Sequence, residues 1–305
     1  MSYQIHKMNE KITVPKLQRM AKAGEKITMI TAYDYTMASL IDEAGIDMVL
    51  VGDSLGMVIQ GHSNTLPVSI DDMVYHTRCV AKGIERAHLM ADMPFLSYQI
   101  SHEEAVSNAG KLIKAGAESV KIEGGEEMAD LVWYLNKVGI PVMAHVGLKP
   151  QSVHIMGGYK VQGKTTKDAD VIINDAQVLE EAGAFSLLLE GLPMEVAQKI
   201  TETVSIPTIG IGSGPRCHGQ VMVIYDLLGA NPHFKPRFVK NYANFHEVCI
   251  KALGHYISDV REGMFPTEEH SVYRELQMLE GGGKQELTKE KGSKKSKRVK
   301  HESEK

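Results

Sequence analysis

The chain has 305 residues, of which 43% are hydrophobic and 24% are charged, and its formal net charge at pH 7 is −4. These proportions are typical of a globular protein, and the slight negative charge argues against a general nucleic-acid binder, which needs a basic surface. No apolar stretch is long enough to cross a bilayer, and residues 1–10 lack the apolar core of a secretory signal. The three scattered cysteines do not suit a disulfide framework. We therefore expect a cytoplasmic protein without membrane or nucleic-acid partners.

Short apolar runs rich in Val and Ile alternate with longer amphipathic segments along the chain. The predicted strands are 27–33, 48–53, 88–92, 119–123, 141–145, 185–190, 207–211 and 221–226. Because these runs show little polar alternation, they are typical of parallel strands that are covered on both faces. Eight such strands without an intervening linker favour an α/β fold with a single (β/α)8 TIM barrel over a doubly wound sheet.

Helical patterns separate the predicted strands, and several of them end at a glycine that leads into the next strand. Ser101 and Glu104 form a capping-box pattern, and the helix that they begin is predicted to end at 114–116. An N-terminal helix before residue 27 is expected to lie across the bottom of the barrel. A last helix at 244–262 is expected to pack around its outside.

The composition changes after residue 280, where the chain becomes polar, lysine-rich and without a hydrophobic period. Such a segment cannot bury enough apolar surface to offset the entropy lost on ordering. We therefore predict a catalytic barrel domain at 1–280 and a disordered basic tail at 281–305. The KKSKR cluster in this tail could bind RNA or another polyanion, but a solvated tail is the simpler interpretation.

Polar side chains gather at the carboxyl ends of the predicted strands, where a barrel of this class carries its active site. They are Asp53 with Ser54, Asp92, Lys121 with Glu123, His145, and Glu190. Lys121 and Glu123 are two residues apart, so a strand directs both side chains to the same face. We expect that face to be the interior of the barrel.

Three of these residues, Asp53, Asp92 and Glu123, are acids from consecutive strands. Carboxylates held close together repel one another, and a divalent cation is the simplest means of neutralising them. All-oxygen ligands favour Mg2+ over Zn2+. Each acid taken singly is better interpreted as a helix cap or a salt-bridge partner. Only the convergence of all three favours a metal site.

Glu190 ends the apolar run at 185–190, where partial desolvation should raise its pKa and suit it to accept a proton. Lys121 could hold a substrate carboxylate. Alternatively, Lys121 could form a Schiff base, as the lysine of a class I aldolase does. The neighbouring acids favour the first role, because a metal ion would already serve as the electron sink.

Longer motifs resemble the ketopantoate hydroxymethyltransferase family. They are ITAYDY (30–35), LVGDSLGMVIQGHSNTLPV (50–68), ADMPF (91–95), VKIEGG (120–125), HVGLKPQSV (145–153), GGYKVQG (157–163), IGIGSG (209–214) and EEHSV (268–272). The likeness covers residues 27–272 almost without gaps, and the VGDSLGMV and GGYKVQG blocks are highly specific. The chain departs from the family at His218, where an acidic residue is common, and in the basic tail, which has no counterpart.

The resemblance implies a barrel of the phosphoenolpyruvate/pyruvate type and a hydroxymethyl transfer. In that reaction 5,10-methylenetetrahydrofolate, 3-methyl-2-oxobutanoate and water give tetrahydrofolate and 2-dehydropantoate, the first step of pantothenate biosynthesis. It also implies one Mg2+ per subunit and a homodecamer. The resemblance implies these roles: metal binding by Asp53, Asp92 and Glu123, oxo-acid contacts by Asp53, Ser54, Asp92 and Lys121, proton acceptance by Glu190, and support by His145.

Two alternatives stay open on the sequence alone. Another magnesium-dependent lyase or mutase of the same superfamily, acting on a 2-oxo acid or a phosphonate, would share the acids but would need no folate site. A non-catalytic barrel whose basic tail binds RNA would not need the acids at the strand ends.

Overall fold

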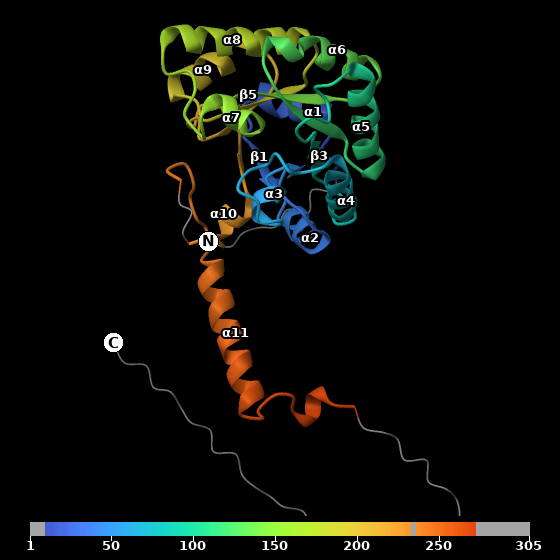
Figure 1. Ribbon diagram of the computed structural model, residues 1–305, viewed down its shortest axis with the longest axis vertical. Coiled ribbons are helices and arrows are strands. Elements are labelled where there is room, and N and C mark those ends of the chain that lie inside the picture. Colours follow the sequence, from blue (N-terminus) through green and yellow to red (C-terminus); the bar gives the residue numbers. More distant parts are fainter. Residues whose placement is uncertain (1–9, 233–235, 273–305) are drawn as a thin grey trace, which may run out of the picture. The chain divides into compact units, whose positions relative to one another are not determined.

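A computed structural model describes residues 10–232 and 236–272, and its parallel strands close into a barrel in chain order (Figure 1). The strands are β1 (Ile27–Thr31), β2 (Met48–Val51), β3 (His88–Asp92), β4 (Ser119–Glu123), β5 (Val142–Gly147), β6 (Ser186–Glu190), β7 (Thr208–Ile211) and β8 (Gly219–Met222). The barrel closes where β8 pairs with β1, with Val221 opposite Met29. The predicted (β/α)8 barrel is confirmed.

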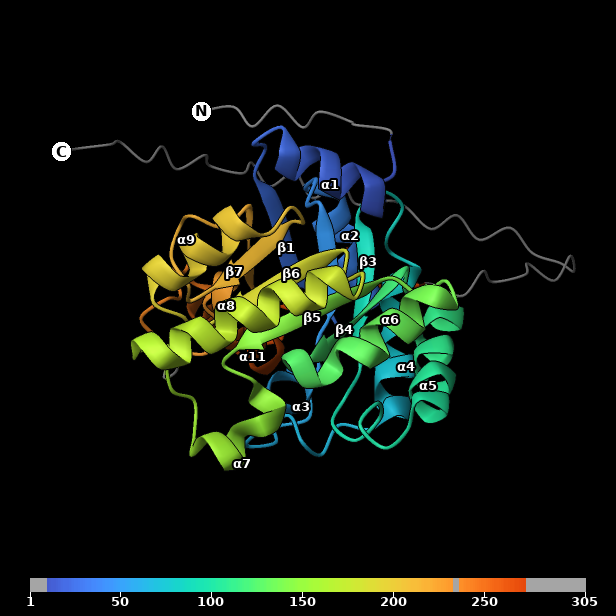
Figure 2. The same ribbon diagram turned by 90° about the horizontal axis from the view of Figure 1, so that it is seen from above.

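Helices connect the strands and cover the outside of the barrel (Figure 2). They are α2 (Tyr35–Glu43), α3 (Leu55–Val58), α4 (Ile70–Ala81), α5 (His102–Ala115), α6 (Ala129–Lys137), α7 (Val153–Met156), α8 (Thr166–Glu181), α9 (Met194–Thr203) and α10 (Ile224–Leu228), with 3-10 turns η1 (Glu126–Met128) and η2 (Pro150–Ser152). Helix α5 begins as predicted, because Ser101 Oγ accepts a hydrogen bond from Glu104 N. It ends at Gly116, whose φ of 118° favours glycine.

One end of the barrel interior is filled with apolar side chains. Met48, Met90 and Met143 pack there with Leu17, which comes from the N-terminal helix α1 (Val14–Lys22). Figure 2 shows α1 at the end of the barrel where the strands begin. The predicted helix at the bottom of the barrel is confirmed. The polar strand ends therefore face the opposite end.

The last strand differs from the prediction. The strand expected at 221–226 is β8 (Gly219–Met222), and residues 224–228 form α10 instead. Gly219 packs so closely on β1 that an added Cβ would collide with the carbonyl oxygen of Ile27. This strand consequently begins with a glycine and a glutamine rather than an apolar run. The apolar residues 224–228, which resemble a strand in sequence, belong to a helix.

The described chain divides into two compact units between Lys251 and Ala252. Helix α11 (Phe245–Arg261) contains this division and matches the helix predicted at 244–262. None of its residues is buried, and its expected packing around the barrel stays a prediction. The boundary expected at 280/281 and the basic tail lie outside the described residues. No helix within the described ranges is long and apolar enough to span a membrane.

Candidate active site

The carboxyl ends of β2, β3 and β4 bring four of the predicted residues into contact. Asp53 N donates a hydrogen bond to Asp92 Oδ2 at 3.0 Å. Lys121 Nζ lies 2.8 Å from Asp92 Oδ1 and 3.9 Å from Glu123 Oε1. All four residues are buried. The alternation along β4 thus directs both of its charged side chains into the barrel, as their spacing predicts.

His145 links this group to Glu190. Its Nδ1 lies 3.5 Å from Glu123 Oε1, and its Nε2 lies 3.4 Å from Glu190 Oε2. The side chain of His145 is 1% exposed and that of Glu190 is 21% exposed, so Glu190 stands at the open edge of the site. Burial lowers the pKa of His145, although Glu123 opposes this effect. A neutral imidazole donates through one nitrogen only, so His145 can donate to just one of the two carboxylates.

The acids of the site outnumber its cation. Burial raises the pKa of Asp53 well above its usual range, and the negative charges of Asp92 and Glu123 raise it further. Burial alone would lower the pKa of Lys121, but the carboxylates of Asp92, Glu123 and Asp53 together raise it above its ordinary value. Lys121 is therefore a permanent cation. It does not neutralise all the negative charge around it.

Glu190 has the electrostatic character of a base. Burial raises its pKa to about 8, and the negative charge of Glu123 adds to this shift, while Lys121 opposes it. The direction matches the expectation from the sequence. A carboxylate with a raised pKa binds a proton more strongly than an ordinary one, which suits it to abstract a proton from carbon.

The oxygens of the three acids fit a hard cation in chemistry and in orientation. One oxygen of each acid accepts a hydrogen bond: Asp92 Oδ2 from Asp53 N, Asp53 Oδ2 from Gln151 Nε2, and Glu123 Oε2 from Gln151 N. Asp92 Oδ1 and Glu123 Oε1 are buried, and the cation beside them is Lys121, at 2.8 and 3.9 Å. The three carboxylates outnumber this cation, and a divalent cation would neutralise the remaining negative charge.

The acids are nevertheless less tightly clustered than the sequence suggested. Within the described ranges, no three His, Cys, Asp or Glu side chains form a ready-made metal cage. Mg2+ commonly keeps several of its waters and takes only one or two protein carboxylates. The contact between Asp53 and Asp92 runs from the backbone N–H of Asp53 to Asp92 Oδ2 and leaves Asp53 Oδ1 without a hydrogen-bond partner among the described residues.

The structure adds three residues that the analysis of strand ends missed. Tyr33 OH lies 2.8 Å from Oγ of the half-buried Ser54. Gln151 contacts Asp53 and Glu123, and Tyr98 OH lies 2.8 Å from Gln151 Oε1. Tyr98 and Gln151 come from the segments that follow β3 and β5. The alternation of side chains along a strand does not predict where residues of such segments lie. Gln151 does lie within one of the family motifs, which was the available signal.

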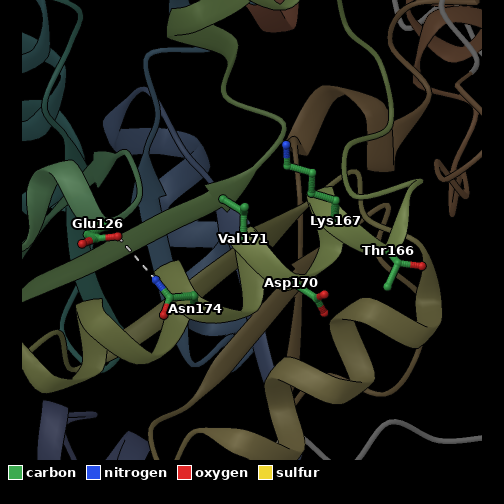
Figure 3. A pocket seen from close by; sticks show the side chains of 6 residues that line it. All are labelled: Glu126, Thr166, Lys167, Asp170, Val171 and Asn174. Atoms are coloured by element: carbon green, nitrogen blue, oxygen red, sulfur yellow. Dashed lines mark hydrogen bonds between the residues drawn. The ribbon is translucent and has the colours of Figure 1, made fainter.

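A surface depression outside the barrel has no buried charged residues of the kind found at the strand ends. It measures about 620 Å³ and is lined by Glu126, Thr166, Lys167, Asp170, Val171 and Asn174 (Figure 3). These residues belong to η1 and α8, outside the barrel. The interaction drawn in Figure 3 is a 3.4 Å hydrogen bond from Asn174 Nδ2 to Glu126 Oε2. Because its charged groups are solvated, we assign the chemistry to the strand ends instead.

Comparison with known proteins agrees with the motifs. A family model described as ketopantoate hydroxymethyltransferase matches residues 11–268. The chain belongs to this family. It is 52% identical over 265 residues to the 3-methyl-2-oxobutanoate hydroxymethyltransferase of Geobacter metallireducens, covering 87% of this chain and 99% of that protein. It is 56% identical over 260 residues to the protein of the same name from Thermotoga sp. (strain RQ2), covering 85% and 96%.

Solved structures share the fold of this family member. Phosphonopyruvate hydrolase in complex with oxalate and Mg2+ superposes with a TM-score of 0.56 at 14% identity, covering 85% of this chain and 93% of the other. A 2,3-dimethylmalate lyase, described as a member of the PEP mutase/isocitrate lyase superfamily, gives a TM-score of 0.53 at 14% identity, covering 85% and 91%. Both likenesses agree with the predicted (β/α)8 barrel. At these identities the likeness concerns the fold alone.

Proposed function

We propose that the chain transfers a hydroxymethyl group from 5,10-methylenetetrahydrofolate to 3-methyl-2-oxobutanoate, giving 2-dehydropantoate in the first step of pantothenate biosynthesis. The observation that carries this proposal is Glu190, a carboxyl group with a pKa raised to about 8 at the edge of a buried acid cluster. Membership of the ketopantoate hydroxymethyltransferase family supports the choice of substrates. The reaction begins with removal of a proton from carbon, which requires such a base.

Lys121 and Ser54 bind the oxo acid. The ammonium group of Lys121 attracts the substrate carboxylate, and Tyr33 orients the hydroxyl group of Ser54 through their 2.8 Å contact. Asp53 and Asp92 complete the contacts to the substrate. A Schiff base at Lys121 is disfavoured, because it requires a neutral amine and the surrounding carboxylates keep this amine protonated.

Asp53, Asp92 and Glu123 would hold one Mg2+ per subunit. The cation, when bound, supplies stabilisation of the negative charge that develops on the keto oxygen of the substrate. These three acids supply only oxygen donors, and among the described residues Lys121 is the one ammonium group in contact with them. That donor set matches a hard ion.

Glu190 accepts the proton from C3 of the oxo acid, and the electrons of the C–H bond pass into the enolate. The enolate carbon then forms a bond to the methylene carbon of the folate. Both bonds from that carbon to the folate nitrogens break, and a water molecule supplies the hydroxyl oxygen of the product. The C3 proton and one proton of the water go to the two nitrogens of the departing tetrahydrofolate. His145, in contact with both Glu190 and Glu123, holds the base in place. The low exposure of His145 keeps water away from this side of the base.

We also propose a cytoplasmic homodecamer with a barrel domain at 1–280 and a tail at 281–305. Helix α11 supports association, because its apolar side chains need an apolar surface to pack against. Its exposed apolar residues include Val248, Ile250, Leu253, Tyr256 and Ile257. A second copy of the chain is the proposed partner for them. The free thiols of all three cysteines suit a reducing compartment.

The proposed activity is tested by measuring 2-dehydropantoate formation with and without EDTA. We expect turnover that depends on both the folate and the divalent cation. A second measurement follows exchange of the C3 proton of 3-methyl-2-oxobutanoate in D2O by NMR, without folate. A lyase or mutase of other specificity should show neither reaction, and that outcome would favour the alternative within the superfamily.

A further inference from the structure

Gln151 makes hydrogen bonds to two of the three acids. Its side-chain Nε2 donates to Asp53 Oδ2 at 2.8 Å, and its backbone N–H donates to Glu123 Oε2 at 3.0 Å. Only 5% of Gln151 is exposed, so both bonds lie in the interior, where a hydrogen bond is electrostatically stronger than in water. One residue of η2, after β5, thus connects acids that follow β2 and end β4.

The side-chain amide of Gln151 is confined to one orientation. Nε2 also donates to Met93 O at 2.9 Å, and Oε1 accepts a hydrogen bond from Tyr98 OH at 2.8 Å. Reversing the amide would place Oε1 against a carbonyl oxygen and a carboxylate, neither of which can donate. Several buried groups would then lose their partners. Asp53 Oδ2 consequently stays occupied by the amide.

Tyr98 supports Gln151 from the loop after β3. While its hydroxyl group donates to Gln151, it also accepts a hydrogen bond from Glu123 N at 3.1 Å. The ring is buried, with 2% exposure. Two residues earlier, Leu96 has a φ of 63°, in the left-handed region that leucine rarely adopts. Backbone strain of this kind is typical of loops that position functional groups.

We propose that Gln151, supported by Tyr98, is a positioning residue that sets the affinity of the site for a divalent cation. It occupies Asp53 Oδ2 and Glu123 Oε2, which leaves Asp53 Oδ1 and Glu123 Oε1 for an ion or its waters. Partners of this kind orient a ligand before the ion arrives, and their loss typically weakens metal binding. The inference rests on the proposed metal site and extends it beyond the three acids.

The test measures Mn2+ binding to the full chain by electron paramagnetic resonance, without either substrate. Gln151→Leu removes the amide and keeps the backbone N–H, and we expect it to weaken binding about 10- to 100-fold. Tyr98→Phe removes only the hydroxyl group and should cause a smaller loss. In the Gln151→Leu background, Tyr98→Phe should cause little further loss, because both residues act through one network.

Gln198→Leu is the matched control, since the Gln198 side chain bonds to Glu202 on the surface of α9. It should bind Mn2+ as the unmodified chain does. Asp92→Asn separates the two proposals. If Asp92→Asn loses Mn2+ while Gln151→Leu keeps it, the positioning role is wrong and the metal site stands. If the unmodified chain does not bind Mn2+, both the metal site and the positioning role are wrong. Should Gln151→Leu fail to fold, unchanged affinity in Tyr98→Phe would overturn the inference.

Discussion

The two ends of the barrel both bury polar side chains, but they differ in the charge that these side chains carry. At the end closed by α1, His88 Nε2 lies 2.8 Å from Ser119 Oγ, and both residues are almost fully buried. Glu118, part-exposed, lies 3.8 Å from His88 Nδ1 and pairs with Lys11 at 2.7 Å. The interior of this end therefore contains neutral groups, and its charges lie toward the surface.

At the open end the interior itself is charged. Asp53, Asp92, Lys121 and Glu123 are all buried, and three carboxylates share one ammonium group. A neutral buried pair stabilises the fold with few consequences for chemistry. Buried charges in excess destabilise the free protein and are retained where a ligand neutralises them. The comparison indicates that one end serves stability and the other serves binding and catalysis.

The largest expected effect at the open end is that of Glu190→Gln. This change keeps the shape of the side chain but removes the proton acceptor, so the rate of C3 proton exchange should fall by about 100- to 10,000-fold. Oxo-acid binding should change little, because the proposed contacts to the substrate come from Lys121 and the other acids. NMR in D2O measures the exchange directly. Glu195→Gln, in the first turn of α9, is the control.

Exchange in Glu190→Gln at the rate of the unmodified chain would move the proton acceptor elsewhere, with His145 as the next candidate. The pH profile gives an independent check. Exchange requires deprotonated Glu190, so kcat/KM should rise with pH. The midpoint of this rise should lie above the ordinary carboxyl pKa and no higher than about 8. Cations in the site lower this pKa and shift the midpoint toward neutral pH. The rise should be absent in Glu190→Gln.

Asp92→Asn should separate catalysis from stability. Loss of a charged oxygen ligand should reduce turnover and raise the Mg2+ concentration needed for half-maximal activity, at a loss of several kcal/mol of transition-state stabilisation. Because Asp92 repels Asp53 and Glu123, the variant should unfold in urea at the same concentration or higher. Its loss of the ion pair with Lys121 works against this gain. Normal turnover at low Mg2+ would remove Asp92 from the metal site.

At the closed end, low pH should destabilise the folded chain because His88 becomes protonated. Burial lowers the pKa of His88 from 6.5 to about 4, so the folded chain binds this proton less readily than the unfolded chain. The stabilisation is complete above pH 6.5 and is lost as the pH falls toward 4. It amounts to about 3 kcal/mol, from roughly 1.4 kcal/mol per pKa unit. Urea unfolding of the unmodified chain and of His88→Asn at several pH values measures it.

The two curves should converge as the pH falls, because the variant has no histidine to protonate. Parallel curves between pH 6.5 and 4 would show that His88 does not control acid stability. The raised pKa of Glu190 works in the opposite sense, since a folded chain that binds a proton more readily gains stability at lower pH. The comparison between variants cancels that contribution.

The smallest effect is expected from truncation after Gly281. The removed residues are polar and have no apolar face to pack. The melting temperature should therefore change by no more than about 1 °C, and turnover should change by no more than the error of the assay. A large fall in melting temperature would show that the basic segment packs on the folded chain and would contradict the proposed boundary.

The sequence predicted the parts of the molecule that depend on regular periods. Apolar runs show where the strands end. The sequence alone therefore places four acids at the carboxyl end of the barrel: Asp53, Asp92, Glu123 and Glu190. Gln151 could not be placed in this way, because it reaches Asp53, 98 residues away in the chain, through a loop whose path no period encodes. The packing of Gly219 against β1 concealed the start of the last strand for a related reason. Close approach of two backbones favours the smallest residue, and the smallest residue has no hydrophobic signal.

Closure of one end by α1 has a consequence for the order of events during turnover. Lys121 and Asp92 are nearly inaccessible, while Glu190 stands at the rim, so both substrates must use the same entrance. In the proposed mode of binding, the oxo acid contacts the buried Lys121 and lies deeper than the folate. We therefore expect the oxo acid to bind first and the folate to cover it. We expect steady-state kinetics of a compulsory-order mechanism, in which tetrahydrofolate departs before 2-dehydropantoate. Product-inhibition patterns would then identify 2-dehydropantoate as the competitor of the oxo acid.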